Sequence, residues 1–288
     1  MTVPRKLLVR VVGAPLLLAA LGGILYWGHR LVQEGLPNRP LNVLVLLVWF
    51  LSILEFWAMC RGRGVAMPNP YLLALAACGG VYALTRLQGG NTPLGLEAAA
   101  VTLILLCILV FRFGKVTPEG AALSLLGFAY TGLVAFLLHV PVAPAVSTFY
   151  LLFLLACAKG SDMAAFVVGK SIGRHPMAPV VSPNKTWEGG IAGGLAGAAA
   201  GFAVLWWTPL KGAFAAVPVP ALLGLALSVT IAAQVGDLVK SAFKRWAGVK
   251  DSGRLLPEFG GMLDMVDSFL VAGPVAHFAT VLVLRASS

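Results

Sequence analysis

The chain has 288 residues, of which 59% are hydrophobic and only 11% are charged, and its mean hydropathy is +0.90. This composition excludes an ordinary soluble domain and predicts an all-α, polytopic membrane protein. The net charge of +10 does not indicate nucleic-acid binding, because the lysines and arginines lie mainly at the ends of apolar segments instead of in one soluble domain.

Nine apolar segments have the length of about 20 residues that a helix needs to cross a bilayer. Prolines, glycines and asparagines separate them. The expected spans are approximately 7–28, 41–60, 71–88, 95–113, 121–139, 147–169, 189–207, 219–240 and 266–285. We expect the eighth span to continue as a helix into the following loop. The pattern predicts an N-terminal part, residues 1–145, with five helices, and a C-terminal catalytic part, residues 146–288, with four.

The distribution of basic residues predicts the orientation in the membrane. With the N-terminus inside, the cytoplasmic segments hold 14 lysines and arginines and the outer segments hold 5. The positive-inside rule therefore predicts a cytoplasmic N-terminus, with the polar loops 170–188 and 241–265 also in the cytoplasm. We expect a bacterial inner membrane, because the chain is compact and shows no targeting extension.

The seventh span has a glycine at every fourth position, at Gly189, Gly193, Gly197 and Gly201. On a helix these glycines form one smooth stripe, which allows close approach of another helix. The run is too regular and too apolar for a phosphate-binding loop. It therefore favours helix packing, either within the chain or in a homodimer.

The aspartates are concentrated in the second half of the chain, inside or beside apolar segments. They are Asp162, Asp237, Asp251, Asp264 and Asp267. Ionisable groups near the bilayer core are costly, so their concentration indicates a functional site. Carboxylates that alternate with lysines and arginines are suited to holding divalent metal ions and phosphates together.

The helix predicted around Asp237 places four polar residues on one face. Asp237, Lys240, Ser241 and Lys244 have the spacing i, i+3, i+4 and i+7. A metal-binding carboxylate would then lie one turn from two phosphate-binding ammonium groups. The alternative is a solvated helix end with ordinary ion pairs, which accounts poorly for an aspartate that follows the apolar run 221–233.

Two further segments belong to the same hypothesis. Asp264 and Asp267 are three residues apart after Gly260-Gly261, so both carboxylates can point the same way beside backbone that can approach a ligand. The loop that begins at Ser182 has the pattern of a Ser/Thr cap ahead of a helix. In the sixth span, Lys159 and Asp162 could neutralise each other, although a role of Asp162 in the site is slightly favoured.

Three segments together form a specific pattern. Its residues are Asp162, Phe166 and Gly169; Ser182 to Gly189; and Ser241, Lys244, Arg245, Lys250, Asp251, Gly253, Pro257, Gly260, Gly261, Asp264 and Asp267. With this pattern, residues 155–270 resemble the phosphatidate cytidylyltransferase family, also called CDP-diacylglycerol synthases. The chain departs from the family pattern at Phe259, where histidine is usual, and at Met265, where arginine is usual. A histidine at the first position could position a phosphate or orient a metal ligand, and an arginine at the second could bind phosphate.

The resemblance implies transfer of CMP from CTP to phosphatidate, with Mg²⁺ as cofactor. Asp237 and Asp264 are then the leading metal ligands, with Asp267 and Asp251 in support. The phosphate-binding groups are expected to be Lys185, Lys244, Arg245 and Lys250, with Ser182, Thr186 and Ser241 also at the substrates. Of these residues, Asp237, Lys244, Asp264 and Asp267 form the expected catalytic set.

Two other functions remain open on the sequence alone. A CTP-dependent polyprenol or dolichol kinase has a similar C-terminal motif, but the loop from Ser182 to Gly189 favours the cytidylyltransferase. A transporter or a non-catalytic membrane relative is the other alternative, and the absence of the usual histidine and arginine at Phe259 and Met265 is the best argument for an inactive relative. Transporters commonly contain internal repeats and charges at the membrane midplane, and this sequence shows no repeat and has its charges toward one side.

Overall fold

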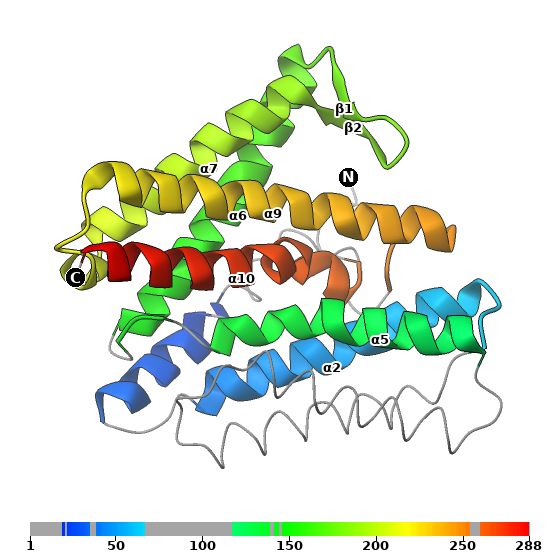
Figure 1. The fold of residues 1–288 in the computed structure, drawn as a ribbon, viewed down its shortest axis with the longest axis horizontal. Helices are drawn as coiled ribbons and strands as arrows, with labels where there is room; N and C mark the ends of the chain where they lie inside the picture. The colour runs from blue at the N-terminus through cyan, green and yellow to red at the C-terminus, as the bar shows by residue number, and fades with distance from the viewer. Residues whose placement is uncertain are drawn as a thin grey trace, which may run out of the picture.

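The structure is a computed structural model that describes residues 19–20, 22–34, 39–66, 117–138, 141–143, 146–253 and 260–287. The spans expected at 71–88 and 95–113 lie outside the described residues, as do Arg254, Phe259 and much of the first span. Within the described part the protein is mostly helical (Figure 1).

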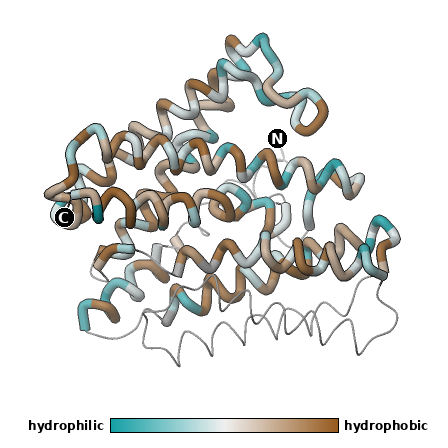
Figure 2. The backbone as a smooth tube through the Cα atoms, viewed as in Figure 1, coloured by the Kyte–Doolittle hydropathy of each residue, from teal (hydrophilic) through white to brown (hydrophobic). Residues whose placement is uncertain are grey.

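The long helices agree with the expected spans. They are α2 (Arg39–Gly62), α5 (Pro118–Gly132), α6 (Ser147–Ile172), α7 (Trp187–Trp207), α9 (Val219–Ala247) and α10 (Met262–Ser287). All of these except α5 are long and apolar enough to cross a bilayer, which gives five candidate spans among the described residues. Figure 2 shows apolar residues along these helices and polar residues toward helix ends and connecting segments. The chain is an integral membrane protein.

The span expected at 121–139 differs from a continuous α-helix. Helix α5 ends at Gly132 and is followed by the 3₁₀ helix η1 (Leu133–Leu138). At this change the indole of Trp49 lies against Gly132, and the backbone N–H of Leu133 donates to the carbonyl of Tyr130. Glycine stabilises an α-helix poorly, so the change from the α-helix to the tighter 3₁₀ helix occurs at this position.

The prediction of an all-α protein was wrong in one segment. The polar loop after α6 forms an antiparallel hairpin of β1 (Pro176–Ala178) and β2 (Ser182–Thr186), in which Pro176 pairs with Thr186 and Ala178 with Ser182. The prolines at 176, 179 and 183 prevent a helix there. A short two-stranded hairpin can form at a loop because both strands are edges that tolerate proline.

The loop expected at 241–265 is shorter than predicted, because helix occupies both of its ends. The predicted continuation of the eighth span is confirmed: α9 extends to Ala247, where Gly248 ends it in the left-handed conformation with φ 72°. Helix α10 then begins at Met262. A glycine in this conformation is the usual end of a helix. The short helix α8 (Leu210–Ala213) lies between α7 and α9.

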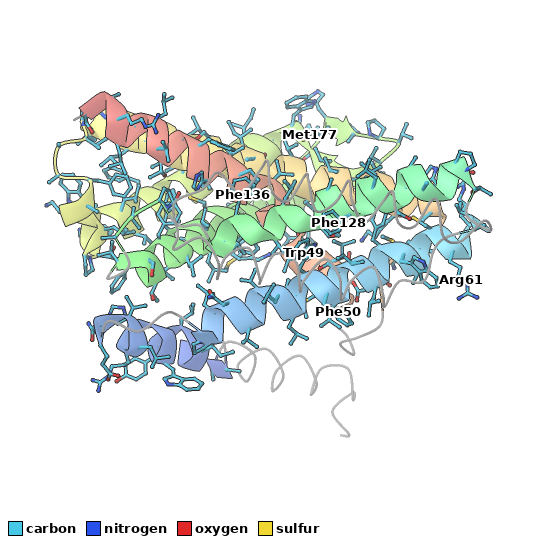
Figure 3. The ribbon with its side chains drawn as sticks, turned by 60° about the horizontal axis from the view of Figure 1, so that its bottom comes forward. Trp49, Phe50, Arg61, Phe128, Phe136 and Met177 are labelled. Carbon is cyan, nitrogen blue, oxygen red and sulfur yellow. The ribbon has the colours of Figure 1, made fainter. Side chains whose placement is uncertain are left out.

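Two clusters of buried side chains form the core, and α10 contributes to both. One joins α6, α7, α9 and α10. The other joins α2, α5 and η1 to α10, with Trp49 and Phe128 in contact at 5.3 Å between ring centres (Figure 3). In Figure 1, α10 accordingly lies between α9 and the pair formed by α2 and α5.

The glycine stripe of α7 packs within the chain. A side chain at Gly189 would collide with the carbonyl of Ala165, one at Gly193 with that of Ser161, and one at Gly197 with that of Cys157. All three carbonyls belong to α6. The predicted role of the stripe in helix packing is therefore confirmed, and the partner is a helix of the same chain.

Candidate functional site

Three aspartates and three lysines from distant parts of the sequence meet at the ends of α9 and α10 beside the hairpin. We call them the ion cluster: Asp237, Asp264, Asp267, Lys185, Lys240 and Lys244. The antiparallel packing of α9 and α10 sets the last turns of one helix against the first turns of the other (Figure 1). Their predicted stripes of polar residues therefore face each other.

A glycine allows α9 and α10 to come this close. A side chain at Gly236, one residue before Asp237, would collide with the backbone of Asp267 and Ser268. Because position 236 has no side chain, the backbones can touch and the two aspartates are brought to a common cation.

Lys240 is the common partner of the three carboxylates. Its Nζ lies 3.1 Å from Oδ1 of Asp237 and 3.4 Å from Oδ1 of Asp264, and it also forms an ion pair with Asp267. The residue is only 7% exposed. Sequence reasoning placed Lys240 on the polar stripe but left it out of the site, because the sequence does not indicate that α10 folds back onto it.

Asp264 has the largest number of polar contacts in the cluster. Its carboxylate pairs with Nζ of Lys244 at 2.8 Å. It also accepts hydrogen bonds from the backbone N–H and the hydroxyl of Ser252, both at 2.9 Å, and from the N–H of Gly261 at 3.3 Å. The loop after α9 and the start of α10 are therefore joined at this one carboxylate.

The hairpin reaches the cluster through Lys185. Nζ of Lys185 lies 2.7 Å from Oδ2 of Asp237, and Nε of Arg245 donates to the carbonyl of Val181 at 3.2 Å. Thr186 ends the hairpin and caps α7 by accepting from the N–H of Gly189 at 3.2 Å, as the sequence pattern predicted.

The remaining predicted residues lie around the cluster. Ser241 follows Lys240 on α9, and Ser182 begins β2. Lys250 and Asp251 are exposed in the loop before Ser252 and, among the described residues, form no ion pair with the cluster.

Asp162 and Met265 have other surroundings. Asp162 pairs with Lys159 at 3.3 Å on α6, so the two neutralise each other as one of the two interpretations expected. Met265 is partly buried in the first turns of α10.

The composition of the cluster suits a divalent cation bound together with phosphates. In the part of the chain that the structure describes, no three His, Cys, Asp or Glu side chains form a ready metal site by themselves, and the ammonium of Lys240 lies among the three carboxylates. Mg²⁺ commonly uses one or two carboxylates and takes its other ligands from water and substrate phosphates. The oxygen donors present therefore fit Mg²⁺ as part of a substrate complex.

A further acidic residue, Glu55, approaches the site from α2. Its carboxylate accepts hydrogen bonds from the backbone N–H groups of Met262 and Leu263, both at 2.8 Å. Sequence reasoning missed it. A signal was present, because Glu55 is an acid inside the expected span 41–60, and such residues are candidates for functional sites.

Comparison with known proteins agrees with the signature. A model of the cytidylyltransferase family matches residues 9–283. Proteins named phosphatidate cytidylyltransferase from Staphylococcus aureus (strain COL) and Staphylococcus haemolyticus are 34% and 32% identical over 264 residues, covering 83% of this chain and 96% of each relative. One from Brucella suis is 42% identical over 127 residues, covering 44% of this chain and 45% of the relative. The chain belongs to the cytidylyltransferase family.

Proposed function

We propose that this protein transfers CMP from CTP to phosphatidate, giving CDP-diacylglycerol and pyrophosphate for phospholipid synthesis. The observation that carries the proposal is the ion cluster, in which Lys185, Lys244, Asp264 and Asp267 of the family signature meet Asp237 and Lys240 of α9. The two Staphylococcus relatives, which this chain matches over nearly their whole length, are named for the same reaction, and this supports the proposal.

The chemistry requires positioning and charge compensation more than proton transfer. A phosphate oxygen of phosphatidate is already anionic, so it can attack the α-phosphorus of CTP without a general base. A new bond forms between that oxygen and the α-phosphorus, and the bond to the oxygen that bridges to the β-phosphorus breaks. Pyrophosphate leaves with the electron pair. The main obstacle is repulsion between two polyanions, which fixed cations relieve.

The lysines and arginine of the site are suited to that task. Lys185 and Lys244 are only partly exposed and are held by aspartates at 2.7 and 2.8 Å. Arg245 and Lys250 are more exposed and can reach an incoming phosphate. We assign these four cations to the phosphates of CTP and phosphatidate, with Ser182, Thr186 and Ser241 as hydrogen-bond donors.

We assign the metal site to Asp237, Asp264 and Asp267, with Asp251 at its edge. Bound Mg²⁺ would neutralise charge on the triphosphate and on departing pyrophosphate. Lys185 and Lys244, the partly exposed lysines of the cluster, would contact the substrate phosphates beside it. Removal of divalent cations by a chelator should stop turnover, and added Mg²⁺ should restore it. Turnover that continues in chelator would contradict the metal assignment.

The length of α9 supports a site at the membrane surface. Its 29 residues extend about 43 Å, more than the ~30 Å of the hydrocarbon core. We place the excess at its last turns, because these carry Lys244 and Arg245. We propose that the chain crosses a bacterial inner membrane nine times, with the N-terminus and the site on the cytoplasmic side. We also propose the division into N-terminal helices (1–145) and a catalytic part (146–288). The homodimer stays a prediction of the sequence, and the glycine stripe does not support it because the stripe packs within the chain.

The direct test uses purified protein in detergent with Mg²⁺, phosphatidate and CTP labelled at the α-phosphorus. Label in the lipid phase with an equal amount of pyrophosphate is the expected result, and it would make Phe259 and Met265 tolerated variations. Transfer of label only from γ-labelled CTP to polyprenol would instead identify a lipid kinase. No transfer in either assay would identify a non-catalytic relative.

A further inference from the structure

Glu55 lies in a membrane helix of the N-terminal part, yet all the side-chain hydrogen bonds that it forms among the described residues reach the C-terminal part. Oε1 accepts from the N–H of Met262 and Oε2 from the N–H of Leu263, both at 2.8 Å. The hydroxyl of Ser252 lies 3.2 Å from Oε2. A carboxylate in an apolar span is costly unless it has partners of this kind.

The contacts to Met262 and Leu263 cap α10. The first N–H groups of a helix have no partner within the helix, and the helix dipole favours a negative charge there. A residue just before the helix usually supplies such a cap. Here a carboxylate from α2 accepts from two successive N–H groups, which fixes both the position and the direction of the first turn of α10. That turn carries Asp264.

Ser252 connects Glu55 to Asp264. Its hydroxyl lies 3.2 Å from Glu55 and 2.9 Å from Oδ2 of Asp264. A hydroxyl has one proton, so it donates to one carboxylate at a time. The backbone N–H of Ser252 also donates to Asp264. The loop after α9 is therefore held between the two acids.

Two glycines leave the space that the Glu55 carboxylate occupies. A side chain at Gly253 or at Gly261 would overlap the carboxylate, and at Gly261 it would also overlap the hydroxyl of Ser252. Both glycines belong to the signature stretch, and this contact gives a physical reason for their lack of a side chain. The carboxylate is enclosed by backbone on the side of the loop and on the side of α10.

We infer that Glu55 is a positioning residue for CMP transfer. This role rests on the proposed function. It holds the first turn of α10 and the Ser252 loop so that Asp264 faces the cations of the ion cluster. It acts through Met262, Leu263 and Ser252 and not on the substrates. A helix of the N-terminal part thereby determines the geometry of the catalytic part.

Glu55→Gln is the informative substitution, because it keeps the volume and replaces one acceptor oxygen by an NH₂ donor. That donor would face an N–H or a hydroxyl. We expect turnover at saturating substrates to fall about 10- to 100-fold, as for other residues that orient metal ligands. The Mg²⁺ concentration that gives the half-maximal rate should rise. The KM for phosphatidate should stay within about two-fold of the wild-type value, because Glu55 does not contact the substrates. Glu119→Gln, in the first turn of α5, is the matched control and should resemble wild type.

Amide hydrogen exchange gives a readout that does not depend on activity. In Glu55→Gln the peptide covering residues 260–268 should exchange faster, while peptides of α7 remain unchanged. Ser252→Ala combined with Glu55→Gln should cost less than the sum of the single effects, because both act on Asp264.

Each failure has a separate signature. A variant with a lower Tm but unchanged turnover per folded molecule and unchanged Mg²⁺ dependence would reduce Glu55 to a structural residue and overturn the inference. Unchanged exchange at residues 260–268 would also overturn it. If wild-type protein transfers no CMP, the proposed function fails, and the exchange experiment still decides whether Glu55 fixes α10.

Discussion

Lys240 determines how three acidic side chains can share a small volume near the membrane. Asp237, Asp264 and Asp267 would repel one another strongly without a cation among them, since water is largely excluded and screening is weak. The lysine is held by all three, and its burial makes it part of the folded structure as well as of the site. Lys185 pairs with the other oxygen of Asp237, and Lys244 shares Oδ1 of Asp264 with Lys240.

Lys240→Met should therefore both destabilise and inactivate the protein. Methionine keeps most of the aliphatic volume but leaves buried carboxylates without their common cation, a change that typically costs about 3–5 kcal/mol. Thermal unfolding in detergent should show a clear decrease in Tm, with turnover near background. Lys211→Met is the control, because Lys211 lies outside the cluster and contacts the ring of Trp206. A Lys240→Met protein with wild-type Tm and rate would disprove this role.

Asp264→Asn tests the carboxylate that has the most contacts. Asparagine keeps the shape but removes the charge that pairs with Lys240 and Lys244. We expect turnover to fall to background while the protein still inserts in the membrane, measured by label transfer and by the amount of extracted protein. Glu34→Gln, outside the candidate spans, serves as the charge-matched control. Near wild-type activity of Asp264→Asn would remove Asp264 from the assigned site.

At the scale of elements, α6 and α7 form a close pair that supports the hairpin. The glycines of α7 let its backbone touch α6, and the side-chain amide of Gln234 on α9 donates to Ser161 at 2.9 Å and to the carbonyl of Gly190 at 3.0 Å. In a membrane, packing and hydrogen bonds of this kind hold helices together, because the hydrophobic effect does not. The hairpin that carries Lys185 is fixed by the same pair.

Gly197→Ala should weaken this pair. The new methyl group would overlap the carbonyl of Cys157 and the side chain of Thr230, and overpacking of this type costs about 1–3 kcal/mol. Gly224→Ala is the matched control, because a methyl group there meets open space on the helix α9 and alanine favours a helix more than glycine does. Thermal unfolding should give a lower Tm for the first variant and an equal or higher Tm for the second. The opposite order would contradict the packing role of the stripe.

At the scale of the whole molecule, α10 joins the two groups of helices. It packs against α9 on one side and against α2 and η1 on the other, and Glu55 caps its first turn. A second connection lies at the end of α2, where Arg63 donates to the carbonyl of Trp246 and its guanidinium stacks on the Trp246 ring at 5.3 Å. The N-terminal helices thus support the site in addition to anchoring the chain.

The proposed orientation can be measured by labelling single cysteines with an impermeant maleimide in a variant without native cysteines. Val180→Cys lies at the exposed turn of the hairpin, and Gly212→Cys lies in α8 at the opposite end of α7. The first should be labelled in inverted membrane vesicles and the second in right-side-out vesicles. The reverse pattern would overturn the cytoplasmic placement of the site.

The sequence by itself determined the class of membrane protein, the family signature and most ends of the described membrane helices. Apolar length and turn residues fix a membrane span locally, and the aspartates of α9 and α10 were recognisable because charge in an apolar context is costly. The spacing of Asp237 to Lys244 and of Asp264 to Asp267 even predicted which residues share a face.

Only the tertiary structure decided which faces meet. The central place of Lys240 depends on antiparallel packing at Gly236, and the role of Glu55 depends on the docking of α2 against a loop about 200 residues later in the sequence. The hairpin was missed because its strands are too short to show an alternating pattern. Local patterns report the preferences of one segment, whereas ion pairs between segments arise only when the packing of the whole bundle brings them together.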